Sequence, residues 1–433
     1  QSNGGGMPFE AAVAGAKTVH TLFSGPAAGA QAAAYLAAED AKKGLVTLDM
    51  GGTSCDIAFI EGGTPLEVTE GEVARRRLDV PALDLTTISA GGGSIAWVDG
   101  GGLLAVGPQS AGADPGPACY GNGGESPTVT DADIACGFLN PDYFLGGAQS
   151  LNVDASLNAL DEKVGKLLSM SALEAAAGIR RIVDMRMADE VRIFGAKRGV
   201  DPQEFTLLPF GGAGAVHAAP VAEELGMSRI LVPRRPGAFS ALGLLCTDVV
   251  HDYIRSELRP LDQVPPNHAE TIFKELEDRG RLELKNEGMD PTAATFTREL
   301  DMRYTGQGYE LRVPLDGISG NKGLDAAALV VARDRFDGIH ARIHGHAAKE
   351  NPAEIVSYRV RARIAVPKYE PATEVVKTMA PAPYSAQKGT RLVWFTSDVP
   401  TETTIWHRDG MPPGSTLSGP AIIEQLDSTT VVP

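Results

Sequence analysis

The sequence predicts an α/β protein in two parts. Residues 1–255 carry alternating strand and helix signals, which are typical of a mainly parallel sheet with helices between its strands. Residues 256–433 read as a smaller α+β part with fewer candidate functional residues. The 433 residues suffice for two or three domains, and the 50 glycines, well above average usage, cluster at turns between strands. We therefore expect a protein built on ligand-binding loops.

Charge and cysteine usage narrow the function classes. A net charge of −16 disfavours nonspecific nucleic-acid binding and leaves no basic face for a membrane surface. The four cysteines form no Cys-x-x-Cys pair, which argues against a zinc cluster or a redox dithiol: Cys55, Cys119, Cys136 and Cys246. Scattered free cysteines fit a reducing cytoplasm. Neither a signal peptide nor an apolar run long enough to span a bilayer is present in the sequence.

The first elements surround the most informative turn of the chain. An alanine-rich helix is predicted from about Ser24 to Ala38, and an apolar strand follows at residues 45–48. The strand ends in Asp49, and a tight turn of two glycines and two hydroxyl residues leads to Asp56: Gly51, Gly52, Thr53 and Ser54. The chain then becomes apolar again, so this stretch predicts a β-hairpin.

The hairpin offers groups that suit a phosphate and a metal. Gly51 and Gly52 let the backbone amides approach a phosphate without a side chain in the way. Asp49, at the strand end, can hold a hydrated Mg²⁺, an ion that keeps waters and uses few protein ligands. Asp56 would lie near the terminal phosphate or brace the turn. An ordinary glycine hairpin, with Asp56 only capping it, remains the alternative.

A second glycine turn follows the next strong strand. Residues 207–210 end in Gly211-Gly212-Ala213-Gly214, which opens a helix over 215–225. His217 lies one turn into this helix and is a candidate catalytic residue. A structural histidine is the alternative, because the helix dipole disfavours an imidazolium at that end.

The region between these turns contains a long loop segment and a long helix. Glycine- and proline-rich loops over 90–150 offer four candidate pocket residues, which turn formation explains equally well: Gln109, Ser110, Asp114 and Tyr120. Asp131 and Asp133 in the same segment are interpreted as loop acids. Residues 171–198 predict an amphipathic helix, whose charged face, including Arg180 and Asp184, is interpreted as solvated or interface surface.

The C-terminal part carries little catalytic signature. Residues 259–266 read as a linker, and 369–390 as an extended connector. Helices are expected over 268–288 and 325–345, and strands over 296–314 and 353–368. His340 and His344 have metal-ligand spacing, with His346 nearby, but no third ligand is evident, so a polar helix end is the preferred interpretation.

Several motifs together resemble the hydantoinase A and 5-oxoprolinase family. They are Asp49-Met-Gly-Gly-Thr-Ser54, Ala90-Gly-Gly-Gly-Ser-Ile-Ala-Trp-Val-Asp99, the segment Gly107 to Gly121, Phe210-Gly-Gly-Ala-Gly-Ala-Val-His217, Arg235 to Gly243 and Tyr304 to Tyr309. The resemblance covers nearly the whole chain. Helix, hairpin and second glycine turn also resemble the actin-like ATPase superfamily, with its ribonuclease-H-like lobes.

The resemblance implies ATP and Mg²⁺ chemistry. It assigns the phosphate-binding hairpin to residues 51–54 and the adenosine-side turn to residues 211–214, with Asp49 orienting Mg²⁺ through water. It implies a hydrolase that opens a cyclic amide, such as a hydantoin or 5-oxoproline, by phosphorylating the ring carbonyl oxygen. Three alternatives remain open: a subunit of an ATP-dependent ketone carboxylase, a lactamase acting on larger rings, and a non-enzymatic actin-like nucleotide switch.

The resemblance also implies partners. A companion hydantoinase B-type subunit or domain would carry out the subsequent hydrolysis, and we expect an oligomer. The family has a first lobe with its own Asp-x-Gly-Gly-Thr turn, and no such turn precedes residue 45. We therefore expect residues 1–433 to be an interior piece that folds but binds ATP weakly and is inactive alone.

Overall fold

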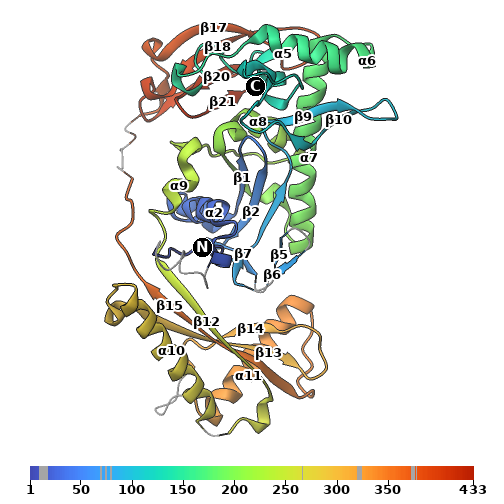
Figure 1. Cartoon of the computed structure of the whole chain (residues 1–433). Helices are drawn as coiled ribbons and strands as arrows, with labels where there is room; N and C mark the ends of the chain where they lie inside the picture. The colour runs from blue at the N-terminus through green and yellow to red at the C-terminus, as the bar shows by residue number, and fades with distance from the viewer. Residues whose placement is uncertain are drawn as a thin grey trace. The chain divides into compact units, whose positions relative to one another are not determined.

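The chain packs as two compact units, shown in Figure 1. The computed structural model describes residues 1–8, 18–68, 71–73, 76–78, 80–265, 267–318, 324–371, 376 and 378–433. The larger unit comprises residues 23–78, 82–246 and 369–433, and the smaller unit comprises 1–22, 79–81 and 247–368. Residues 256–433, which were expected to form one part, are shared between the two units. The domain boundary near residue 255 stays a prediction.

A five-stranded mixed sheet organises the larger unit, which confirms the α/β class. Its order is β11 (Thr206–Phe210), β1 (Leu45–Met50), β2 (Cys55–Glu61) and β3 (Thr64–Pro65), with β8 (Leu85–Ile88) also paired to β2. Only β1 and β11 run parallel in this sheet. The expectation of a mainly parallel sheet is therefore wrong, because a tight turn such as the one between β1 and β2 can join only antiparallel strands.

Helices cover both faces of this sheet. On one side lie α2 (Ser24–Leu36), α3 (Ala38–Lys43) and α9 (Phe239–Gly243), and on the other α7 (Ala172–Arg198) and α8 (Gly211–Leu225). The predicted helices at 24–38 and 171–198 are confirmed. A capping box between Ser171 and Glu174 starts α7, and Gly199 ends it in the left-handed conformation.

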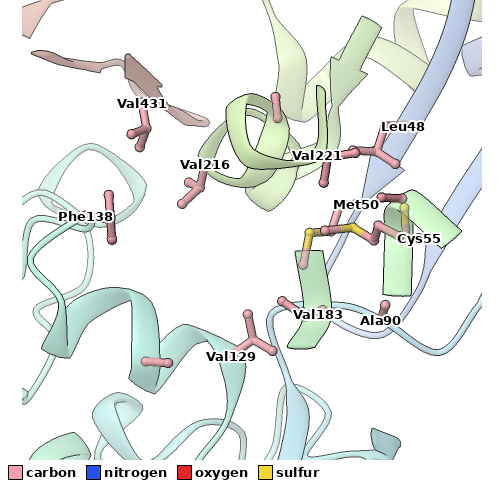
Figure 2. Close-up of a cluster of buried hydrophobic side chains, with 14 of the residues drawn as sticks. Leu48, Met50, Cys55, Ala90, Val129, Phe138, Val183, Val216, Val221 and Val431 are labelled. Carbon is pink, nitrogen blue, oxygen red and sulfur yellow. The ribbon is translucent and has the colours of Figure 1, made fainter. Parts of the chain in front are cut away.

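The alternation of strand residues sends side chains to these two layers. Val46, Leu48 and Met50 of β1 join the core with α7 and α8. Figure 2 shows Leu48, Met50 and Cys55 from the hairpin strands near Val183 of α7 and Val221 of α8. Odd-numbered residues of β1, such as Leu45, point to the α2 and α9 side. Asp49 has the same parity as Leu45 and therefore lies on that side too.

The glycine- and proline-rich region after the hairpin contains more regular structure than loops alone. It holds β9 (Ser94–Val98), β10 (Leu104–Ser110) and α4 (Val129–Ala135), and α5 (Val153–Leu160) and α6 (Lys166–Leu168) follow it. Short strands precede it: β4 (Glu67–Val68), β5 (Gly71–Val73), β6 (Arg76–Leu78) and β7 (Ala82–Leu83). A second capping box, formed by Thr128 and Asp131, starts α4.

The end of the chain returns to the larger unit. A four-stranded sheet contains β17 (Gln387–Val393), β18 (Thr401–His407), β20 (Ala421–Glu424) and β21 (Thr429–Val432). A separate small pair is formed by β16 (Ala380–Pro381) and β19 (Ser415–Thr416). β21 packs on α8, and Val431 and Val216 belong to one core (Figure 2).

The smaller unit is a four-stranded antiparallel sheet with two helices against it (Figure 1). Its elements are β12 (Val249–Pro260), β15 (Ala353–Ile364), β13 (Thr295–Tyr304), β14 (Leu311–Pro314), α10 (His268–Asn286) and α11 (Ala326–His344). The helices predicted at 268–288 and 325–345 are confirmed. The linker predicted at 259–266 is wrong in its first residues, since β12 continues to Pro260 through its pairing with β15.

The histidines of α11 serve this fold. His340 is buried, and its ring nitrogens lie 2.7 Å from the carbonyl of His346 and 3.0 Å from the Gln307 amide nitrogen. Among the described residues no group of three metal-binding side chains is found. None of the helices in the described parts of the chain combines the length and apolar character needed to cross a membrane.

Candidate functional site

The hairpin brings its two carboxylates face to face. β1 and β2 pair with Asp49 opposite Asp56 and Met50 opposite Cys55. Residues opposite each other in an antiparallel pair point to the same face. The turn is closed by the Gly51 amide, which donates to the Ser54 carbonyl at 3.1 Å. Both carboxylates thus lie at the end of the sheet, one residue from the glycine turn.

The second glycine turn lies directly beside the first. Because β1 and β11 are parallel with Asp49 opposite Phe210, Gly51 and Gly211 leave the sheet at the same edge. Gly211 has a φ of 77°, and a Cβ there would overlap the Met50 carbonyl, so only glycine fits. α8 then starts without a side-chain cap. An uncapped helix start presents free amides, which favour an anion.

A third glycine segment packs on the back of the hairpin. The amides of Gly92 and Gly93 donate to the carbonyls of Gly51 and Gly52, at 3.0 and 2.6 Å. A Cβ on Gly91 would lie 2.5 Å from the Thr53 nitrogen. Three glycine segments distant in the sequence therefore meet at one sheet edge.

These segments border a cavity of about 180 Å³. Its wall combines backbone of the glycine turns with polar and apolar side chains. It is lined by Gly51, Gly52, Gly92, Tyr120, Thr130, Asp133, Leu139, Asn140, Tyr143, Phe144, Leu145, Gly212, Ala213, Val216 and residues 424–429. The hairpin and the 211–214 turn, which the resemblance assigns to one nucleotide, thus both contribute to the wall of one cavity.

Glycines on this wall leave open space. A Cβ built on Gly51, Gly52 or Gly212 would meet nothing within 4 Å, so these three positions are not glycine for packing inside the chain. Gly214 differs, because it is buried and a Cβ there would lie 3.1 Å from the Leu48 carbonyl. The open glycines fit a group that approaches the backbone closely.

Asp49 and Asp56 lie beside this cavity and do not line it. They share the face toward α9, where the Ser240 hydroxyl donates to Asp49 at 3.0 Å. Thr87 donates to Asp56 at 2.5 Å. Burial raises the pKa of Asp49 to about 6; the Ser240 hydrogen bond opposes the rise and the nearby Asp56 adds to it. Burial also raises the pKa of Asp56.

His217 is fully buried in a charged network. Its Nδ1 lies 2.6 Å from Asp184 and its Nε2 lies 3.3 Å from Asp133, which also pairs with Arg180. Burial disfavours an imidazolium, but the two carboxylates outweigh it and raise the pKa of His217 to about 9. His217 does not line the cavity; Asp133 does. The expected dipole effect on His217 is overridden by these two partners.

The network corrects the interpretation of the α7 surface. Arg180 and Asp184, expected on a solvated face, are 8% and 7% exposed. They share one side of α7 with the buried Ile179, Val183 and Met187. Their spacing of four residues could have indicated their burial, since the buried apolar residues of this helix have the same spacing. Asp133 itself was interpreted only as a loop acid, and it lies in α4.

The loop candidates are divided by the structure. Tyr120 lines the cavity, whereas Gln109, Ser110 and Asp114 do not belong to its wall. The Ser110 hydroxyl accepts from the Gly112 amide at 3.2 Å, as a turn residue does. Sequence reasoning did not single out Asn140, Tyr143 or the segment 424–429, because their polar and aromatic residues form no motif.

Comparisons with known proteins cover the whole chain. Residues 1–253 match the hydantoinase/oxoprolinase domain, and residues 265–433 match the hydantoinase/oxoprolinase C-terminal domain. The caprolactamase α subunit of Pseudomonas jessenii is 34% identical over 439 residues, which is 100% of this chain and 62% of that protein. Its solved structure, described as an ATP-dependent caprolactamase, matches 100% of this chain with a TM-score of 0.79 at 32% identity.

Carboxylase subunits are similar as well. The acetophenone carboxylase γ subunit of Aromatoleum aromaticum is 33% identical over 423 residues, covering 95% of this chain and 57% of that protein. A nucleotide-free acetone carboxylase structure matches 100% of this chain and 61% of that one, with a TM-score of 0.84 and 28% identity. The chain spans about three fifths of the length of these relatives. On the evidence of its domains and its relatives, this chain belongs to the hydantoinase/oxoprolinase family.

Proposed function

We propose that the protein takes part in ATP-dependent opening of a cyclic amide, of the hydantoin or 5-oxoproline type, by phosphorylating the ring carbonyl oxygen. The observation that carries the proposal is the meeting of two glycine turns, around Gly51 and Gly212, on one cavity with open space over their backbone. Open backbone amides at a helix start and a hairpin suit a phosphate group.

The nucleotide is assigned to this sheet edge by the actin-like ATPase interpretation. Residues 51–54 would hold its phosphates, with Thr53 and Ser54 adding hydroxyl donors. Gly212 and Ala213, at the uncapped start of α8, would meet the nucleotide from the adjoining turn, while Gly211 and Gly214 allow that turn to pack against β1. The fit rests on the open Cβ positions described above.

Asp49 is the residue proposed to hold Mg²⁺, through water. Its carboxylate and that of Asp56 lie on one face at the end of the hairpin, and carboxylate oxygens are the ligands that Mg²⁺ uses in proteins. Bound there, the ion would neutralise charge that develops on the phosphates. Burial raises the pKa of Asp49 to about 6, so its charged form is unfavourable unless a cation binds nearby. This supports Asp49 as the residue that binds Mg²⁺.

The glycine turn separates two sides of the proposed site. Asp49 and Asp56 lie on the α9 side, and the cavity lies on the side of α4 and α8. A terminal phosphoryl group held at Gly51 and Gly52 would therefore have the metal-binding carboxylates on one side and the substrate cavity on the other. This arrangement suits transfer from nucleotide to substrate by positioning.

The chemistry requires activation because an amide carbonyl is a poor electrophile. Phosphorylation of the carbonyl oxygen is the first step and makes the ring carbon electrophilic. In the second step water adds to this carbon, the C–N bond breaks to leave a free amine and an acyl phosphate, and a further water releases phosphate and the carboxylate. We propose that a companion hydantoinase B-type subunit or domain performs this second step. The caprolactamase and acetophenone carboxylase relatives are named as subunits, which supports a hetero-oligomer. The four buried free cysteines fit the proposed cytoplasmic location.

His217 is proposed to act only through its neighbour. With no exposed surface and both ring nitrogens near carboxylates, it cannot touch a substrate. Its role is to fix Asp133 on the cavity wall.

ATP-dependent ketone carboxylation is the second candidate. The acetophenone carboxylase subunit is 33% identical and the caprolactamase subunit 34%, so similarity alone does not choose between the two substrates. Phosphoryl transfer to a ketone-derived enolate or to bicarbonate would use the same phosphate turns.

A substrate panel tests the proposal. ADP release by the full-length protein with its companion subunit is measured with hydantoin, 5-oxoproline, 2-pyrrolidinone, caprolactam, acetone and acetophenone. We expect a cyclic amide to stimulate ADP release at least tenfold and the ketones not to. Stimulation by the ketones and not by the cyclic amides, with bicarbonate present, would instead establish the carboxylase. No ATP binding to the wild-type protein would refute both candidates.

A further inference from the structure

Asp133 is a charged side chain of the cavity wall, and its helix α4 is hydrogen-bonded to the glycine hairpin through Gly92. The Gly92 amide donates to the Gly51 carbonyl at 3.0 Å. The Gly92 carbonyl in turn accepts from the Thr130 amide at 2.7 Å and from its hydroxyl at 2.8 Å. Thr130 and Asp133 are three residues apart on α4, so they share one face of that helix. Both line the cavity.

The Asp133 carboxylate is fixed by its surroundings. Arg180 pairs with Oδ1 and His217 lies 3.3 Å from Oδ2, so two cations hold one carboxylate. Burial disfavours the charged form of Asp133, but these partners outweigh it and lower its pKa. Asp133 is therefore an anionic acceptor that cannot rotate away. Each carboxylate oxygen has two lone pairs, which leaves capacity for one more donor.

Other acidic residues of the wall are bound to other groups. Glu424 pairs with Lys388 and Arg391 and accepts from Asn140 at 3.3 Å. Asp427 accepts from the Gly237 amide at 3.0 Å and from Gln425 at 2.6 Å. Both lie on the segment 424–429, which has no bonded link to the hairpin comparable to that of Asp133 through Thr130 and Gly92.

The wall of this cavity is mixed in polarity. Leu139, Phe144, Leu145 and Leu426 supply apolar surface, and polar side chains such as Asn140 and Tyr143 line it as well. A fixed acceptor with apolar surface on the same wall suits a small ring that carries an N–H donor. A cyclic amide has this N–H next to its carbonyl, whereas a lactone or a ketone has only the carbonyl.

We propose that Asp133 is a specificity-determining residue that accepts a hydrogen bond from the ring N–H of the substrate. This inference rests on the proposed function and adds the group that distinguishes amides from ketones. The N–H bond to Asp133 directs the adjacent carbonyl oxygen toward the phosphate hairpin. A substrate without the N–H forgoes this hydrogen bond to a charged acceptor, which favours the amide over a lactone or a ketone.

The test compares matched rings on the wild-type full-length protein with its companion. The probes are 2-pyrrolidinone, N-methyl-2-pyrrolidinone and γ-butyrolactone, and the corresponding seven-membered set from caprolactam. kcat/KM for stimulated ADP release should be at least about 10-fold higher for the lactam than for either analogue of the same ring. This comparison needs no mutation, so it does not depend on the folding of a variant.

Two variants then separate selection from structure. Asp133→Ala removes the acceptor and should bring the lactam-to-lactone ratio close to one. Asp184→Ala removes the other carboxylate of His217, which does not line the cavity, and should lower stability comparably while the ratio stays near that of the wild type.

Each result of these tests supports a different conclusion. Equal use of lactam and lactone by the wild type would overturn the role of Asp133 and leave the proposed function intact. An unchanged ratio in Asp133→Ala would also overturn it. Stimulation by ketones alone would overturn both the cyclic-amide function and this inference.

Discussion

Replacing Asp49 by asparagine should stabilise the larger unit while it abolishes ATP turnover. The pKa of Asp49 is raised from 3.8 to about 6, mainly by burial. The folded state therefore binds the proton more tightly than the unfolded state between these values, and stability falls as pH rises through that window. Two pKa units correspond to about 3 kcal/mol of penalty above pH 6. Asparagine removes the charge and keeps an oxygen that can accept from Ser240.

The assay is urea unfolding followed by tryptophan fluorescence at pH 4, 5.5 and 7.5. All three tryptophans, Trp97, Trp394 and Trp406, belong to the larger unit, so the signal reports this unit alone. At pH 7.5 Asp49→Asn should raise the free energy of unfolding by about 1 to 3 kcal/mol, and the gain should shrink toward zero near pH 4.

Activity and a matched control complete this prediction. ATP turnover by the full-length protein should fall at least about 100-fold, because charge positioning supplies much of phosphoryl-transfer catalysis. Asp99→Ala is the control: Asp99 accepts from the amides of Gly101 and Leu103 in another hairpin turn, and its loss should cost about 1 to 2 kcal/mol. If Asp49→Asn is destabilised as much as this control, Asp49 is only a turn brace and the reasoning is refuted.

Three further predictions concern the cavity and its network. Gly212→Ala should leave the unfolding midpoint unchanged or slightly higher but weaken Mg²⁺-ATP binding in calorimetry at least about 10-fold. Gly338→Ala, the same change at an exposed position of α11, should raise stability by up to about 1 kcal/mol without affecting binding. Unchanged binding in Gly212→Ala would contradict the phosphate site. Because the pKa of His217 is raised to about 9, the stability that its protonation adds is complete below pH 6.5 and is lost as pH rises through 9. The free energy of unfolding, measured from pH 6 to 10, should fall by an amount on the order of 3 kcal/mol that His217→Gln does not show. Equal pH dependence in the wild type and the variant would contradict the charged network. Arg180→Met should destabilise the larger unit by about 3 to 5 kcal/mol, since it leaves Asp133 with one cation, and a loss below about 1 kcal/mol in urea unfolding would mean that the pair is solvent-screened.

Local patterns predicted the elements that place the site. The helical periodicity over residues 171–198 predicted α7, and the glycine turn after an apolar strand predicted the hairpin of Asp49 and Asp56. The same turn excluded a parallel neighbour on that side of β1, which the overall alternation of strands and helices did not reveal. A local turn constraint is therefore stronger evidence for strand direction than the order of elements.

The residues that charge the cavity wall could not be predicted in this way. Asp133 and His217 are 84 residues apart, and their distance of 3.3 Å depends on how α4 and α8 pack. Arg180 was expected at the surface because charged helix faces usually are, and its burial is possible only because Asp133 offsets its charge.

The sequence by itself determined the family resemblance, the two glycine turns and the identity of the hairpin carboxylates, since these depend on residues close together in the chain. Only the tertiary structure decided which groups share a cavity: Gly51 and Gly212 lie on its wall, Asp49 lies on the opposite side of the turn, and Asp133 lies where a loop acid had been expected. The physical reason is that backbone turns are encoded by neighbouring residues, whereas the burial and pairing of charges depend on partners that the packing of distant helices provides.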